Sequence, residues 1–185
     1  MDLRETEYGV LRQTIATRGT MRMVLFPVVM LGWAGLAASM MAFADLPVLA
    51  IFSLGVLVGG FEAIHALHVG VERIGRYVQV FYEGSIDAPR WETTAMAVGP
   101  ALPGGGIDPL FTLVFASATV VNMIAAMVPH VTRLELMVVV GLHLAFVIRL
   151  ARARGAAARQ RAVELETFKA IKAQAPASGP EAPAL

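Results

Sequence analysis

The feature that most constrains this chain is a series of long apolar segments separated by short polar or proline-containing stretches. As an α-helix, a segment of about 20 apolar residues spans the ~30 Å hydrocarbon core of a membrane. Four segments come close to this description: residues 21–43, 47–69, 109–128 and 133–150. The sequence therefore predicts an all-α polytopic membrane protein, whose transmembrane domain is an up-down bundle of four helices over residues 21–150.

The overall composition agrees with an apolar environment. The 185 residues are 57% hydrophobic and 16% charged, whereas soluble domains average roughly 25% charged residues. The chain has no cysteine, which excludes disulfides, thiolate metal ligands and cysteine nucleophiles. Arginine greatly outnumbers lysine, and alanine, valine and glycine are abundant. This composition is typical of a high-GC bacterium, so the bacterial inner membrane is the expected location.

Local signals predict where the helices begin. The segment 45–47 has the form of a tight turn leading into the second helix. Asp108 and Pro109 are typical of the N-cap and first residue of a helix. The segment 132–135 matches a capping box and predicts that the fourth helix starts at Arg133.

The polar segments predict structure outside the bilayer. Residues 1–20 have helical periodicity, which indicates a short amphipathic helix on the membrane surface, with a turn at 19–20. Residues 70–108 are predicted to contain a cytoplasmic extension of the second helix followed by a Gly/Pro-rich loop. Residues 151–173 are charged and helix-forming, so they extend the fourth helix into the cytoplasm. The tail 174–185 is rich in alanine and proline and is predicted to be disordered.

Orientation follows from the distribution of positive charge. Fourteen of the 15 Lys and Arg residues fall in the N-terminal segment, the middle segment or the C-terminal segment. Arg133 is the exception. Because cytoplasmic segments of membrane proteins carry the excess of positive charge, both termini are predicted to be cytoplasmic.

A polar stripe on the second helix is the main candidate for chemistry. Its members follow one another at helical spacing from inside the predicted span toward the cytoplasm: Glu62, His65, His68, Glu72, Arg73 and Arg76. A carboxylate at the depth of Glu62 is expensive and should face protein or water. Two interpretations remain open: a path for protons or cations, or a hydrogen-bonded cluster that locks the bundle.

Cofactor sites are less well supported. Glu62-x-x-His65 is the spacing used in di-iron bundles, but those need a second such pair and further carboxylates. A bis-histidine haem site would pair His143 with His65, which are predicted to lie at different depths. We therefore assign neither a metal nor a cofactor. A simpler role for His143 is a hydrogen bond to a backbone carbonyl or to Asn122 of the third predicted helix.

Small residues predict close helix packing. Gly55 and Gly59 are spaced as in the GxxxG motif, with Gly60 following, and Gly141 with Ala145 repeats the pattern. This motif supports a protein partner or a homo-oligomer formed through the second helix, although it names neither. The basic flanks are better explained by anionic lipid than by nucleic acid.

Three classes of function remain. The first is a non-enzymatic scaffold or accessory subunit of a larger membrane complex, which the small size, packing glycines and long cytoplasmic helices favour. The second is an oligomeric proton or cation channel or transporter that uses Glu62 and His65. The third is a haem- or metal-binding membrane protein. No catalytic residue set is evident in the sequence, so no enzyme class is assigned.

Overall fold

A computed structural model describes residues 3–42, 48–83, 90–98, 108–127 and 132–174. Within these ranges every regular element is a helix: α1 (Leu3–Ala42), α2 (Val48–Phe81), α3 (Trp91–Val98), α4 (Thr112–Ala126) and α5 (Arg133–Gln174). The all-α prediction is therefore confirmed. Three of the helices, α1, α2 and α5, are apolar and long enough to cross a membrane. The fourth apolar helix, α4, has 15 residues.

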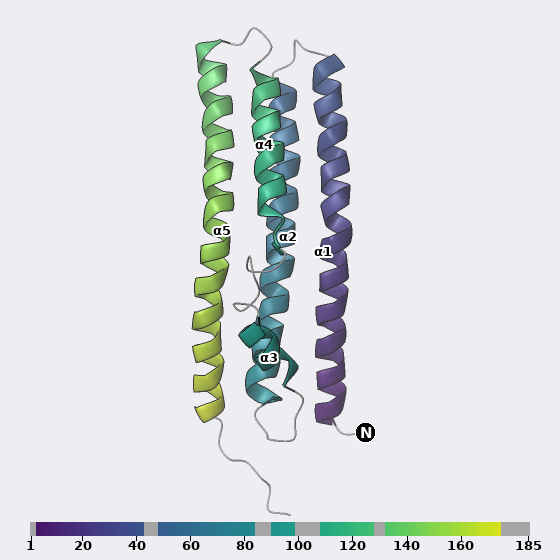
Figure 1. Ribbon diagram of the computed structural model, residues 1–185, viewed down its shortest axis with the longest axis vertical. Helices are drawn as coiled ribbons and strands as arrows, with labels where there is room; N and C mark the ends of the chain where they lie inside the picture. Colours follow the sequence, from purple (N-terminus) through teal and green to yellow (C-terminus); the bar gives the residue numbers. More distant parts are fainter. Residues whose placement is uncertain (1–2, 43–47, 84–89, 99–107, 128–131, 175–185) are drawn as a thin grey trace, which may run out of the picture.

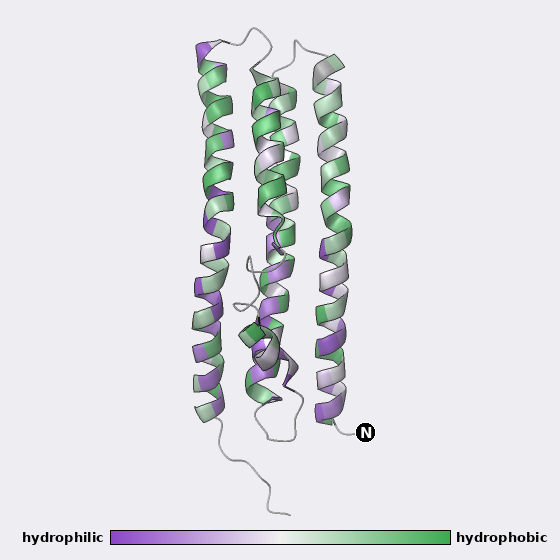
Figure 2. Cartoon of the chain, in the orientation of Figure 1, coloured by the Kyte–Doolittle hydropathy of each residue, from purple (hydrophilic) through white to green (hydrophobic). Residues whose placement is uncertain are grey.

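Helices α1, α2, α4 and α5 stand side by side and alternate in direction, with α2 between α1 and α5 (Figure 1). Helix α4 lies against α2 and α5 only in the upper part of the molecule. Figure 2 shows that this upper part is mostly apolar, whereas the lower part mixes polar and apolar residues. We call the lower part the stalk; it comprises residues 3–20 of α1, 70–83 after the apolar part of α2, α3, and 151–174 of α5.

Helix α1 differs from the sequence prediction. We expected a separate surface helix over residues 1–20 and a turn at 19–20, but α1 is continuous from Leu3 to Ala42. The Thr20 hydroxyl donates to the Ala16 carbonyl within the helix, 3.1 Å away. The first turns of α1 pack against the end of α2 and its following residues. The Tyr8 and Tyr82 rings, for example, are in contact, with centroids 5.4 Å apart. Tertiary packing thus outweighs the weak break signal of one glycine and one threonine.

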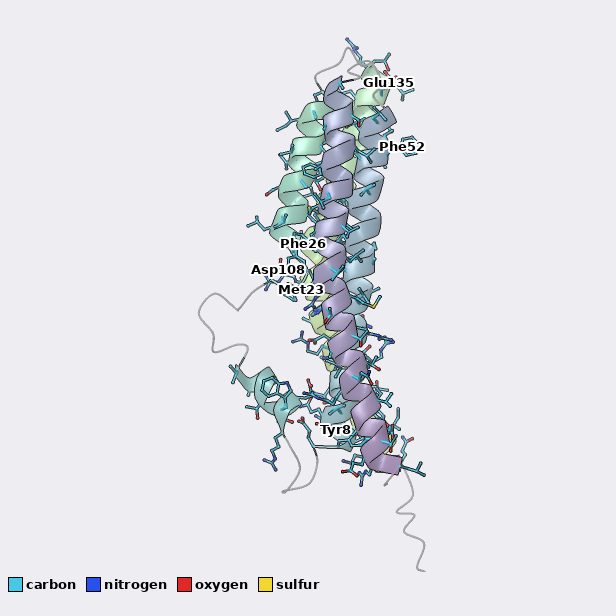
Figure 3. All side chains as sticks on the ribbon, turned by 90° about the vertical axis from the view of Figure 1, so that its right-hand side faces the viewer. Tyr8, Met23, Phe26, Phe52, Asp108 and Glu135 are labelled. Carbon is cyan, nitrogen blue, oxygen red and sulfur yellow. The ribbon has the colours of Figure 1, made fainter. Side chains whose placement is uncertain are left out.

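Helix α4 also begins later than expected. The predicted start at Pro109 is wrong, because Phe111 has a left-handed backbone (φ 52°) and the helix begins at Thr112. Asp108 still caps the segment: its carboxylate accepts hydrogen bonds from the backbone N–H groups of Leu110 (3.1 Å) and Thr112 (2.6 Å). The Phe111 ring stacks on Phe26 of α1, with 4.1 Å between centroids. Figure 3 places Asp108 beside Met23 and Phe26, about halfway along the molecule.

The remaining boundary predictions have mixed outcomes. Helix α5 begins at Arg133, and Glu135 accepts hydrogen bonds from the Thr132 backbone N–H and hydroxyl, both at 2.8 Å, as in a capping box. It continues without a break to Gln174. The predicted Gly/Pro-rich loop is wrong in part, because residues Trp91–Val98 within it form helix α3, and Gln174 of the predicted tail is the last residue of α5. The predicted turn at 45–47, the loop residues 84–89 and 99–107, and the tail from 175 onward lie outside the described residues.

The core consists of two apolar clusters. The larger lies in the middle of the molecule and includes Val29, Leu54, Phe61, Phe115 and Phe146. The smaller lies nearer the top, where it joins α1, α2, α4 and α5: Met40, Ala50, Ala126 and Val139. On each of α2, α4 and α5, buried polar side chains lie between the residues of the two clusters along the sequence: Ser53, Thr119, Asn122 and His143.

The glycines divide into two groups. A Cβ added to Gly60 would overlap Val29 of α1, so Gly60 is where α1 and α2 approach closely. Gly55, Gly59 and Gly141 have no atom within 4 Å of an added Cβ. Within the described chain these three glycines therefore make no close helix contact, and their proposed role in packing rests on contacts outside this chain.

Candidate functional site

The polar stripe of α2 is met by charged side chains from α1 and α5. At its upper end, Arg149 Nη2 donates to Glu62 Oε2 at 2.8 Å, while the Arg149 guanidinium lies 5.5 Å from the centroid of the Phe61 ring. The two side chains keep 36% and 43% of their surface exposed. Glu62 is therefore a paired carboxylate at the edge of the bundle and not an isolated buried acid.

The two histidines of the stripe differ in their partners. His68 is buried, and its Nδ1 lies 3.1 Å from Arg22 Nη1 of α1. Because arginine can only donate, His68 Nδ1 accepts this bond and its proton resides on Nε2. His65 packs against the Phe61 ring, and its buried Nε2 has no hydrogen-bond partner among the described residues.

The lower part of the stripe forms a network of ion pairs with α5. Buried Arg76 donates to Glu72 Oε2 (3.0 Å) and to Glu164 Oε2 (3.3 Å). Arg161 contacts the same Glu72 oxygen at 2.8 Å, and Arg73 donates to Glu164 Oε1 at 2.8 Å. Removing one partner of such a buried pair typically costs about 3–5 kcal/mol, because the remaining charge is left without compensation.

This network lowers the pKa of Glu164. Burial by itself opposes ionisation, but hydrogen bonds from Arg73 and Gln160, together with the charge of Arg73, outweigh it. The pKa of the carboxyl group therefore lies below its ordinary value of 4.5. The ionised form is the one that joins α2 to α5.

Further contacts join all three helices at the far end of the stalk. Tyr77 donates to Glu7 at 3.0 Å, and Lys172 Nζ donates to the Val80 carbonyl at 2.5 Å. Burial, together with a hydrogen bond to Glu7, raises the pKa of Tyr82 to about 12. The neutral phenol is thus the stable form over the physiological range.

The N-terminus of helix α3 attaches it to the rest of the stalk. The Glu83 carboxylate accepts hydrogen bonds from the backbone N–H groups of Glu92 (2.7 Å) and Thr93 (2.8 Å). This places a negative charge where the helix has its positive end. Arg12 of α1 pairs with Glu92 at 2.5 Å. A cavity of about 460 Å³ opens between α2, α3 and α5; both lysines of the chain line it, Lys169 and Lys172.

A second polar site lies inside the apolar part of the bundle. Asn122 Nδ2 lies 3.0 Å from the Ala50 carbonyl oxygen and 2.9 Å from His143 Nε2. Since an amide nitrogen only donates, His143 Nε2 accepts, and His143 Nδ1 donates to the Val139 carbonyl at 2.7 Å. His143 is therefore neutral with a defined tautomer. The site joins α2, α4 and α5. His143 forms both of the hydrogen bonds that the sequence suggested as alternatives, one to Asn122 and one to a backbone carbonyl.

An aromatic cluster separates the two polar sites. Phe61 and Phe115 are fully buried, and Phe61 makes edge contacts with Phe115 and Phe146 at centroid distances of 5.4 and 5.9 Å. These rings fill the middle of the bundle between the level of Glu62 and that of Asn122. Among the described residues, no hydrogen bond or ion pair bridges this apolar layer.

The sequence identified the stripe on α2 but missed most of its partners. The missed residues are basic side chains of α1 and α5 and one acid of α5: Arg22, Arg149, Arg161 and Glu164. Arg149 and Arg161 were interpreted only as orientation signals, because the register between helices cannot be derived from one sequence. Among the described residues, no three His, Asp or Glu side chains gather in a geometry suited to a metal ion.

Comparisons with protein-family models, curated proteins and solved structures find no match to this chain.

Proposed function

We propose that this chain is a non-enzymatic scaffold or accessory subunit of a larger complex in a bacterial inner membrane. In this proposal the apolar part crosses the bilayer four times, through α1, α2, α4 and α5. Both termini and the stalk lie in the cytoplasm, where the stalk presents a fixed surface to a partner.

One observation carries the proposal: three helices pass from the apolar part into the stalk without interruption and are cross-linked there by ion pairs and hydrogen bonds. The buried Arg76 connects two carboxylates from different helices. Glu83 and Arg12 attach α3 to the same unit. A stalk tied at so many points holds its outer surface in one geometry, as a scaffold requires and a disordered tail would not provide.

The alternative of a proton or cation conductor has less support in a single chain. Glu62, the carboxylate that this alternative depends on, already forms an ion pair with Arg149 at 2.8 Å. Above this pair the aromatic cluster of Phe61, Phe115 and Phe146 fills the bundle. A proton path through one copy would have to cross this apolar layer.

The asymmetry of charge supports the proposed orientation. The stalk carries most of the arginines, whereas Arg133 is the one basic residue near the opposite end of the bundle. We expect reporter fusions at position 45 and near position 130 to read periplasmic. Fusions near position 95 and at the C-terminus should read cytoplasmic. A periplasmic C-terminus would contradict the orientation.

The scaffold is tested by separating complex formation from conduction. The native mass of the protein is measured after extraction in mild detergent, and proton flux is measured in liposomes with wild type and Glu62→Gln. We expect a complex of defined stoichiometry that a charge reversal of the stalk (Lys169→Glu with Lys172→Glu) dissociates, and no flux from either protein. Proton flux in wild type that disappears in a folded Glu62→Gln protein would replace the scaffold with the conductor.

A further inference from the structure

Two arginines of α1 stand at the junction between the apolar part and the stalk. Arg18 and Arg22 are one helical turn apart, about 6 Å along the axis. Arg22 directly precedes Met23, which Figure 3 places at the middle of the molecule, level with Asp108. In the proposed membrane placement, on which this inference rests, this is the level of the inner-leaflet headgroups.

Neither arginine forms an ion pair with a described acidic residue. Arg22 contacts His68, which accepts its hydrogen bond as a neutral ring, and the buried Nε of Arg22 has no hydrogen-bond partner among the described residues. Glu72 acts on Arg22 electrostatically, but it already contacts Arg76 and Arg161. The junction therefore carries positive charge that the described carboxylates do not balance.

The backbone of α2 leaves space for this charge. A Cβ on Gly70 would lie 2.6 Å from Arg18 Nη1, so the guanidinium occupies the place where any side chain at position 70 would stand. Beside and above the two arginines, α1 has exposed apolar side chains: Met21, Val24 and Val28 are 54–58% exposed. Two arginines without carboxylate partners among the described residues thus lie next to an exposed apolar surface of the same helix.

We infer that Arg18 and Arg22 bind the phosphodiester headgroup of one anionic phospholipid at the surface where α1 meets α2. The two guanidinium groups donate to the non-bridging phosphate oxygens, and such charge-assisted bonds are among the strongest hydrogen bonds in proteins. The acyl chains follow the exposed apolar surface of α1.

Native mass spectrometry of the purified protein in detergent, titrated with phosphatidylglycerol, tests this site. We expect Arg22→Gln and Arg18→Gln each to weaken lipid binding about tenfold, the usual effect of losing one charged hydrogen bond. Arg152→Gln removes the same charge from an exposed position on α5 and should stay within about twofold of wild type, because distant charges are screened. Phosphatidylcholine should bind more weakly than phosphatidylglycerol.

A second variant protects the test against misfolding. Gly70→Val keeps both arginines but occupies the space of the Arg18 guanidinium, so it should also weaken lipid binding while circular dichroism stays unchanged. Equal losses in Arg22→Gln and Arg152→Gln would reduce the effect to general surface charge and overturn the site. Displacement of the lipid by inorganic phosphate in excess would show a site for a free anion instead. Carbonate washing of wild-type membranes tests the membrane placement separately from the lipid site.

Discussion

Replacing Gly60 with alanine tests the tightest contact between α1 and α2. A Cβ at this position would overlap Val29 Cγ1 and lie 2.5 Å from Cγ2 and 2.9 Å from Cβ. All three atoms belong to a β-branched side chain, whose χ1 angle is nearly fixed in a helix. Val29 is 7% exposed. The extra methyl group can therefore be accommodated only if the two helices move apart.

Gly59 provides the matched control, because an added Cβ there has no atom within 4 Å. Overpacking of a core by one methyl group costs about 1–3 kcal/mol. Both substitutions gain up to about 1 kcal/mol from the better helix propensity of alanine. We therefore expect Gly60→Ala to be less stable than Gly59→Ala by about 1–3 kcal/mol. This order is the reverse of the one that the GxxxG spacing of Gly55 and Gly59 suggests.

Reversible unfolding in mixed SDS and mild-detergent micelles, followed by circular dichroism, measures this difference. The addition of Val29→Ala should recover part of the stability lost in Gly60→Ala, because it removes the two methyl carbons nearest the new Cβ while residue 29 keeps its own Cβ at 2.9 Å. A double-mutant cycle then isolates the contact from the loss of Val29 itself. Equal stability of Gly60→Ala and Gly59→Ala would show that α1 and α2 do not pack at Gly60.

Two further predictions concern the polar sites. Asn122→Leu should lower the free energy of unfolding by about 1–3 kcal/mol, because it leaves the buried Nε2 of His143 without its donor; Val121→Leu, on the exposed side of α4, should change it little. Because the pKa of Glu164 is lowered in the folded state, its contribution is complete above the ordinary value of 4.5 and is lost as the pH falls through the folded pKa. Thermal unfolding at pH 7 and at successively lower pH should therefore show that the wild-type protein loses stability in acid. This loss of stability should be smaller in Glu164→Gln and unchanged in the exposed control Glu166→Gln.

The sequence was sufficient for the helical class because the apolar segments are long and the end signals are strong. The capping box before Arg133 is a local motif whose partners lie three residues apart, so it could be recognised without knowledge of the fold. The break before α4 could not be recognised in this way. It depends on the stacking of Phe111 against Phe26, residues that are far apart in the chain.

The candidate site shows the same division between local and distant information. The periodic spacing of Glu62, His65, His68 and Glu72 placed them on one stripe of α2. Which side chains meet this stripe depends on the register between antiparallel helices. A shift of one residue in that register would bring different side chains to the stripe. Arg22 and Arg149 each had an adequate explanation as flanking charges, so nothing in the sequence distinguished them from Arg152, which remains exposed.

The length of α4 has a consequence for the surrounding lipid. Fifteen residues rise about 22 Å, which is less than the ~30 Å thickness of a typical hydrocarbon core. The chain enters α4 through Asp108 and a left-handed turn, so the apolar surface on that side of the bundle is shorter than on the side of α1. A bilayer adapts to such hydrophobic mismatch by local thinning. In the proposed membrane placement, the inner leaflet should therefore be thinner beside α4 than beside α1.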